Sequence, residues 1–123
     1  MEKRNNINNN ALLYSVNEYL AHLQFERRLA KNTIIAYSLD LKRYVRFLFI
    51  VNNINSPASI QHKDIEMYIN SFYIKTKGNR NNKLPKNISL NRMISSIRGY
   101  HHYLYQNGMA PENHAQLLIS PRI

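Results

Sequence analysis

Residues 26–48 read ERRLAKNTIIAYSLDLKRYVRFL, and residues 89–108 read SLNRMISSIRGYHHYLYQNG. In both stretches apolar residues recur every three or four positions, the spacing that places them on one side of an α-helix. The other positions carry Lys, Arg, Asn, Ser and Thr with few carboxylates. Such an acid-poor face is what a helix needs in order to lie against the phosphate backbone of a duplex.

The whole chain shares this basic character. Its 123 residues include 17 Lys and Arg against 7 Asp and Glu, for a formal net charge of +10. A field of this sign favours polyanionic partners, because each phosphate neutralised releases condensed counterion. Composition alone also allows a surplus kept for solubility, or a ribosome-associated or membrane-surface protein.

Length and residue usage narrow the class further. A chain of 123 residues suits one domain, and the absence of cysteine excludes disulfides and thiolate metal sites. The first ten residues, MEKRNNINNN, lack the apolar core of a signal peptide, and the most apolar window, residues 44–51, is too short to span a membrane. We therefore expect a cytoplasmic protein with no membrane partner.

The apolar spacing predicts an all-α fold with no strand. Four helices are expected over residues 11–28, 32–51, 62–74 and 88–106, followed by a short turn over residues 113–119. Residues 1–10 are expected to form a disordered arm, and residues 75–87, which are rich in Lys and Arg, an exposed loop. The second helix is apolar nearly all round at its end, so this end is either core or a partner surface.

The two quoted stretches resemble the core-binding signature of tyrosine recombinases, the Xer and phage-integrase group. In the first stretch the resemblance is carried by Arg28, Leu29, Asn32, Thr33, Ala36, Tyr37, Asp40, Leu41, Tyr44, Phe47 and Leu48. In the second it is carried by Ser89, Leu90, Arg92, Ile94, Ile97, Arg98, Tyr100, Leu104 and Gly108, with Asn113 beyond. The motifs follow the family's order, and the resemblance covers residues 11–123.

The resemblance implies a four-helix, SAM-like orthogonal bundle with a short C-terminal helical turn. Residues 11–119 would form one half of a C-shaped clamp around a double-stranded DNA recombination site, and residues 120–123 would start the linker to a C-terminal catalytic domain absent from this chain. In the family that domain carries the nucleophilic tyrosine, and the parent acts as a tetramer on paired sites without a metal or nucleotide cofactor. This chain is therefore expected to bind DNA and to contain no catalytic residues.

The expected DNA contacts lie on the two quoted helices. They are Lys31, Asn32, Thr33, Lys42, Arg43, Asn87, Ser89, Asn91, Arg92, Ser95 and Arg98. Ser96 is expected on the same outer face, Asn91 and Arg92 are the candidates for base edges, and Lys42 and Arg92 should face one side of the molecule. Arg98 either anchors a phosphate or pairs with Asp40 or Glu26.

Some positions depart from the family pattern. Ala30, Lys31 and Gln61 stand where Ser, Pro and Thr are common at helix starts, so capping either moves to Asn32 or Thr33 or is lost. His114 stands where proline is usual, which affects the last turn. Ile35 and Leu39 occupy outward positions of the second helix, as tolerated surface residues or as contacts to thymine methyl groups.

The histidines and tyrosines are interpreted as structural. Because neighbours on a helix point about 100° apart, His101 and His102 are expected to be one packed and one solvated side chain rather than a metal site. Most tyrosines fall on apolar stripes and are expected in the core. Two other functions stay open: a helix-turn-helix regulator, disfavoured by long connections between helices, and a helical protein-interaction module that docks through the end of the second helix.

Overall fold

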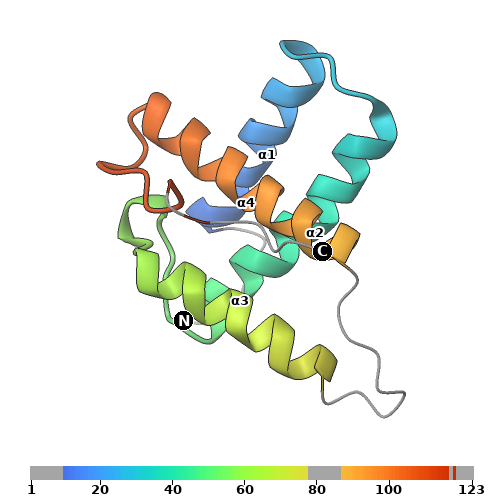
Figure 1. The fold of residues 1–123 in the computed structure, drawn as a ribbon. Helices are drawn as coiled ribbons and strands as arrows, with labels where there is room; N and C mark the ends of the chain where they lie inside the picture. The colour runs from blue at the N-terminus through green and yellow to red at the C-terminus, as the bar shows by residue number, and fades with distance from the viewer. Residues whose placement is uncertain (1–9, 78–86, 117, 119–123) are drawn as a thin grey trace.

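The computed structural model describes residues 10–77, 87–116 and 118, and these form an all-α fold (Figure 1). Helices α1 (Ala11–Phe25), α2 (Lys31–Ile50), α3 (His62–Lys77) and α4 (Asn87–Gln106) follow one another, with the single 3-10 turn η3 (Pro57–Ser59) before α3. No strand occurs in the described residues. The predicted fold class and the four predicted helices are confirmed.

Helix α2 is the centre of the bundle. It packs against α1, α3 and α4, whereas α1 and α4 also contact each other. Figure 1 shows α1 and α2 meeting at the top of the view, α4 crossing them, and α3 lying below beside the end of α2. This position explains why α2 carries the longest regular apolar seam in the sequence.

An aromatic cluster around Tyr44 fills the middle of the core. The Tyr44 ring is fully buried and lies 5.2 Å from the Tyr68 ring and 6.3 Å from the Tyr100 ring, centroid to centroid. These tilted and edge-on arrangements suit the quadrupoles of aromatic rings. The expectation that these tyrosines pack in the core is confirmed.

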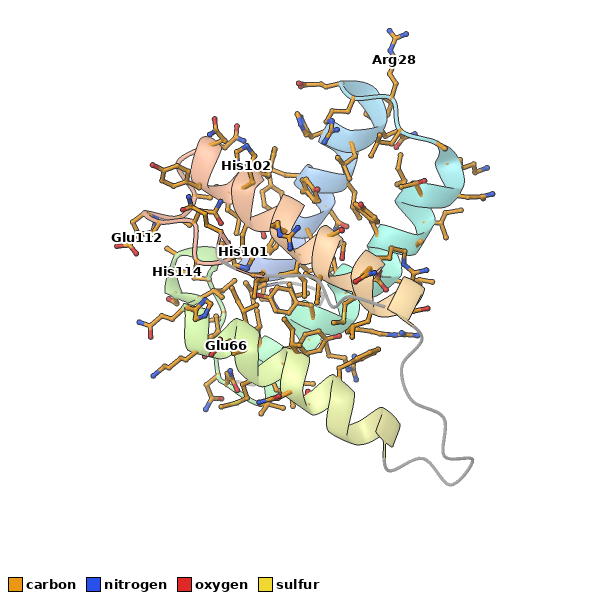
Figure 2. All side chains as sticks on the ribbon, viewed as in Figure 1. Arg28, Glu66, His101, His102, Glu112 and His114 are labelled. Atoms are coloured by element: carbon orange, nitrogen blue, oxygen red, sulfur yellow. The ribbon has the colours of Figure 1, made fainter. Side chains whose placement is uncertain are left out.

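Each polar group in this cluster has a partner on another helix. The hydroxyl of Tyr44 lies 2.8 Å from Nε2 of His101, and the hydroxyl of Tyr100 lies 2.7 Å from Oγ of Ser15. Burial lowers the pKa of His101 to about 3, so its ring is neutral at physiological pH. His102, by contrast, is exposed, which confirms the expected division between the two histidines (Figure 2).

Three helices end at a residue with left-handed backbone. Arg28 follows α1 with φ 54°, Asn53 follows α2 with φ 57°, and Gly108 follows α4 with φ 73°. At Gly108 the two closing bonds of a Schellman motif form, from Met109 N to the Leu104 carbonyl at 2.8 Å and from Gly108 N to the Tyr105 carbonyl at 3.2 Å. Helix α1 therefore ends at Phe25 rather than at the predicted Arg28.

The helix starts differ in how they are capped. Asn10, predicted to belong to the disordered arm, caps α1 by accepting from the Leu13 amide at 2.9 Å. Helix α2 starts after Ala30 with no side-chain cap, so the cap is lost rather than moved. At α3 the carboxylate of Asp64 accepts from the Gln61 amide at 2.8 Å and from the Asn52 side chain at 2.9 Å.

The segments after α3 and α4 complete the comparison with the sequence. Lys75 and Lys77, predicted in the loop, belong to α3, and residues 78–86 lie outside the described part, as do residues 1–9. The predicted final turn is present, with backbone bonds from Gln116 to Asn113 at 3.2 Å and from Leu118 to Ala115 at 3.1 Å. The predicted end of this turn at residue 119, and the predicted linker residues 120–123, lie outside the described residues.

Candidate nucleic-acid interface

An ion pair between Asp40 and Arg92 joins α2 to α4. Nε of Arg92 donates to one carboxylate oxygen of Asp40 at 2.8 Å, and Nη2 donates to the other at 3.0 Å. The Asp40 side chain is only 5% exposed, whereas that of Arg92 is 41% exposed. A two-point contact of this kind fixes the position of one helix relative to the other.

The same pair determines what Arg92 presents to solvent. A guanidinium has five N–H donors, and two of them are used on Asp40. The hydrogen bond to Asp40 raises the pKa of Arg92, so the group is permanently charged. The remaining donors lie at the edge of the α2–α4 contact, where they can reach a phosphate oxygen.

The predicted contact residues of α2 point in different directions. At about 100° per residue, Thr33 lies within about 20° of Asp40 around the helix and Arg43 within about 60°. Lys42 lies about 160° away from Asp40 by the same geometry. Thr33 and Arg43 therefore share the side of α2 that carries Arg92, and Lys42 does not, contrary to the expectation that Lys42 and Arg92 face one side.

Of the remaining α2 residues, Asn32 lies about 80° from Asp40 and Lys31 about 180°. Both side chains are exposed, as are Ile35 and Leu39. The two apolar residues are thus on the surface, as expected from the sequence. Lys31 and Lys42 form a second cationic edge of α2, separate from the Asp40 side.

The first turns of α4 carry short polar side chains, with one exception to the expected pattern. Asn91 and Ser95 are partly exposed, and Ser89 is also partly buried. Ser96 is fully buried and its hydroxyl donates to the Met93 carbonyl at 2.7 Å, so it does not belong to the outer face. Asn87 is the first residue of α4, and its side chain lies outside the described part of the structure.

Arg98 contacts the C-terminal turn. Its Nη2 donates to the Leu118 carbonyl at 2.7 Å. Of the structural partners considered from sequence, Asp40 is occupied by Arg92, and Glu26 lies 3.4 Å from Nδ1 of His22. The predicted role of Arg98 at a phosphate remains a prediction.

Sequence reasoning missed the partner of Arg92. Asp40 is the one carboxylate in α2, and α4 contains none. A lone acid next to a buried seam position, here Leu41, is the signal that could have identified a structural ion pair, because a buried carboxylate needs a cation. The sequence does not say which cation supplies it.

Two further searches concern other kinds of site. Among residues 10–77, 87–116 and 118, no group of three or more His, Asp or Glu side chains could hold a metal ion. None of the helices in the described ranges combines the length and the apolar character that a membrane span requires.

The chain was compared with known proteins. Residues 16–108 match the model of the family described as phage integrase, N-terminal SAM-like domain. A tyrosine recombinase of Thermosipho africanus is 31% identical over 106 residues, which cover 86% of this chain and 34% of that protein. A tyrosine recombinase of Pseudothermotoga lettingae is 33% identical over 112 residues, 91% of this chain and 35% of the relative.

The tyrosine recombinase XerD of Listeria monocytogenes is 29% identical over 93 residues, 76% of this chain and 29% of the relative. The chain thus spans about a third of the length of the curated relatives it matches. No solved structure matches the chain. Because the family model covers most of the chain, from α1 to the end of α4, the chain belongs to the phage-integrase N-terminal SAM-like family and is the N-terminal SAM-like domain of a tyrosine recombinase.

Proposed function

We propose that this domain binds double-stranded DNA and forms one half of the clamp that a tyrosine recombinase closes around its recombination site. The proposal is supported by the family assignment and by the net charge of +10. A surface of this charge gains affinity for a duplex by releasing condensed counterions.

The Asp40–Arg92 pair is the observation that carries the proposal. Asp40 is the one acid on α2 and α4 together, and Arg92 neutralises it within the helix contact. The two packed helices then present cations, amides and hydroxyls with no uncompensated carboxylate between them. An approaching phosphate therefore meets no repulsive group on this side of the bundle.

The contacts divide into a central and a flanking set. Thr33, Arg43, Asn91, Arg92 and Ser95, which lie on or near the α2–α4 contact, form the central set, with Asn91 and Arg92 reaching base edges. Phosphates on either side would be reached by the flanking set: Lys31, Asn32, Lys42, Asn87, Ser89 and Arg98. A helix in the major groove contacts both phosphate walls, so cations around more than one side of α2 are useful there.

The remainder of the activity belongs to the full-length protein in this proposal. A separate catalytic domain would supply the nucleophilic tyrosine and exchange strands through a transient tyrosyl phosphate, with four protomers assembled on two sites in the cytoplasm. A tyrosine becomes a nucleophile only beside a base and cations that stabilise the phosphorane charge. This domain would contribute binding and position.

Titration of duplex DNA at two salt concentrations tests the proposal. The affinity of the domain should fall steeply with salt, and Arg43→Glu should weaken binding and reduce the salt slope by about one. The matched control is Lys63→Glu, which makes the same change of charge at the start of α3, on the opposite side of the view from the start of α4 (Figure 1). Equal losses for both variants would contradict the assigned surface, and binding without a salt slope would favour a protein-interaction module.

A further inference from the structure

A groove of about 570 Å³ lies between the end of α2 and the middle of α3. It is lined mainly by Arg43, Arg46, Phe47, Ile50, Val51 and Phe72. Figure 1 places the end of α2 beside α3, at the far end of α2 from its connection to α1. The groove thus coincides with the stretch of α2 that is apolar on nearly every side.

The floor of the groove is apolar and accessible. Ile50 and Val51 are each 56% exposed, although they follow a core helix whose neighbouring residues Val45 and Leu48 are fully buried. Phe47 packs edge-on against Tyr68 at 5.2 Å and gives the groove a rigid base. Adjacent exposed aliphatic side chains over a preformed aromatic base are typical of a surface that another molecule covers.

The rim of the groove is basic. Arg43 and Arg46 lie on successive turns of α2, and no carboxylate is among the residues that line the groove. Within the described ranges, neither arginine forms an ion pair, because Asp40, one turn earlier, is taken by Arg92. Two available guanidinium groups beside an apolar floor are complementary to a ligand that is both acidic and apolar.

We propose that this groove binds an amphipathic helix of another protein, with apolar side chains at i, i+3 or i+4, and i+7 and with carboxylates beside them. The apolar side chains would cover Ile50, Val51 and Phe72, and the carboxylates would pair with Arg43 and Arg46. This is the helix-in-groove mode of recognition. The proposal goes beyond DNA binding and does not rest on it.

Charge decides among the possible occupants. The segment 78–86 of this chain contains Arg80, Lys83 and Lys86 and no acid, and residues 1–9 contain Lys3 and Arg4 against Glu2, so neither complements a basic rim. A second copy also carries +10 and would be repelled. A DNA duplex would satisfy the arginines but would place phosphates against aliphatic side chains, which gain nothing from that contact.

The test uses two labelled synthetic peptides of about 16 residues, a length at which helices become appreciable. One places Leu at helical spacing on a Glu-rich background, and the other has the same composition in scrambled order. Fluorescence anisotropy with the whole chain should show the patterned peptide binding at least about tenfold more tightly than the scrambled one. Equal affinities would show attraction by charge alone and would overturn the proposal.

Matched substitutions locate the site. Ile50→Ser and Arg46→Glu should each weaken binding of the patterned peptide about tenfold. Leu39→Ser, at an exposed leucine on the outer side of α2, and Lys63→Glu should leave it unchanged, with circular dichroism confirming the fold of every variant. Equal effects of Ile50→Ser and Leu39→Ser would overturn the proposal.

Two other results would assign the groove elsewhere. If Arg46→Glu weakens duplex binding as much as Arg43→Glu while the two peptides bind alike, the groove belongs to the nucleic-acid surface. If the chain alone forms a dimer in sedimentation that Ile50→Ser abolishes, a second copy occupies the groove. Either result would overturn the peptide proposal.

Discussion

The hydroxyl of Tyr19 on α1 occupies the position where a side chain at residue 99 of α4 would have to start. Gly99 is therefore needed for the close approach of the two helices. Burial raises the pKa of Tyr19 to about 12, so the group facing Gly99 is a neutral phenol. The Tyr19 ring also packs against Tyr103, one turn after Gly99, at 5.3 Å.

Gly99→Ala should destabilise the domain despite the better helix propensity of alanine. The propensity gain is about 1 kcal/mol, and overpacking against Tyr19 costs about 1–3 kcal/mol. Urea denaturation should show a net loss, and adding Tyr19→Phe to Gly99→Ala should recover part of it, because the hydroxyl that blocks the added methyl group is gone. Purely additive effects of the two changes would contradict a direct clash.

The Asp40–Arg92 pair predicts an asymmetric response to mutation. Arg92→Ala leaves a carboxylate that is 5% exposed without its cation, and should cost about 3 kcal/mol of unfolding free energy. Asp40→Asn should cost less, because Arg92, 41% exposed, can turn to water. Denaturation midpoints of the two variants measure the difference, and the reverse order would contradict the burial of Asp40.

The same pair makes a prediction about DNA. Asp40→Asn removes a negative charge beside the proposed surface and releases donors of Arg92, so duplex affinity should be maintained or increased. Arg92→Ala should reduce duplex affinity, when both are measured under conditions where each variant is folded. Weaker binding by folded Asp40→Asn would show that the pair itself, rather than the charge of Arg92, organises the surface.

His62 predicts a pH-dependent contact at the C-terminal turn. Its Nδ1 lies 2.9 Å from the His114 carbonyl and its Nε2 lies 3.0 Å from a Glu66 carboxylate oxygen, so only the doubly protonated ring donates to both. The bond to the His114 carbonyl, with a smaller contribution from Glu66, raises the pKa of His62 above 6.5.

A raised pKa means that the stabilisation is complete below pH 6.5 and is lost as pH rises through the folded-state pKa of His62. Amide exchange in the turn around His114 should therefore be faster, relative to the intrinsic rate, at pH 8 than at pH 6. His62→Gln should abolish that difference, and a wild-type NMR titration with an unshifted His62 would contradict the contact.

His101 predicts the opposite dependence in acid. Its pKa is lowered to about 3 by burial, so the unfolded chain binds this proton below pH 6.5 while the folded chain does not. Stability should fall as pH decreases from 6.5 toward 3, by up to about 1.4 kcal/mol per pH unit from this group. Tyr44→Phe combined with His101→Leu removes both partners and should flatten this part of the stability curve.

The regular part of the fold could be predicted from periodicity because α2 and α4 bury one side each. The apolar seam that ends at Val51 identified α2 to within one residue at each end. The end of α1 could not be predicted in the same way, because Arg28 adopts a left-handed backbone that its residue type does not favour. Lys75 and Lys77 were misassigned since charge is compatible with both a loop and a helix surface.

The candidate surface was predictable in composition but not in geometry. The sequence shows that α2 and α4 are poor in acids, yet the choice of Arg92 rather than Arg98 as the partner of Asp40 depends on where two distant helices cross. Ser96 was misassigned because a serine that bonds to its own helix, here at the Met93 carbonyl, is tolerated in a core. Lys42 was grouped with Arg92 by charge, although helical geometry separates them.

The hydrogen bond from Arg98 to Leu118 attaches the final segment of the described chain to α4, and the bond from His62 to His114 attaches the preceding turn to α3. These two fasteners make the exit of the chain part of the same rigid body as Asn91, Arg92 and Ser95. Any torque applied at the exit is then delivered to the helix that faces the duplex, so the bundle would behave as a lever arm and not as a bead on a string.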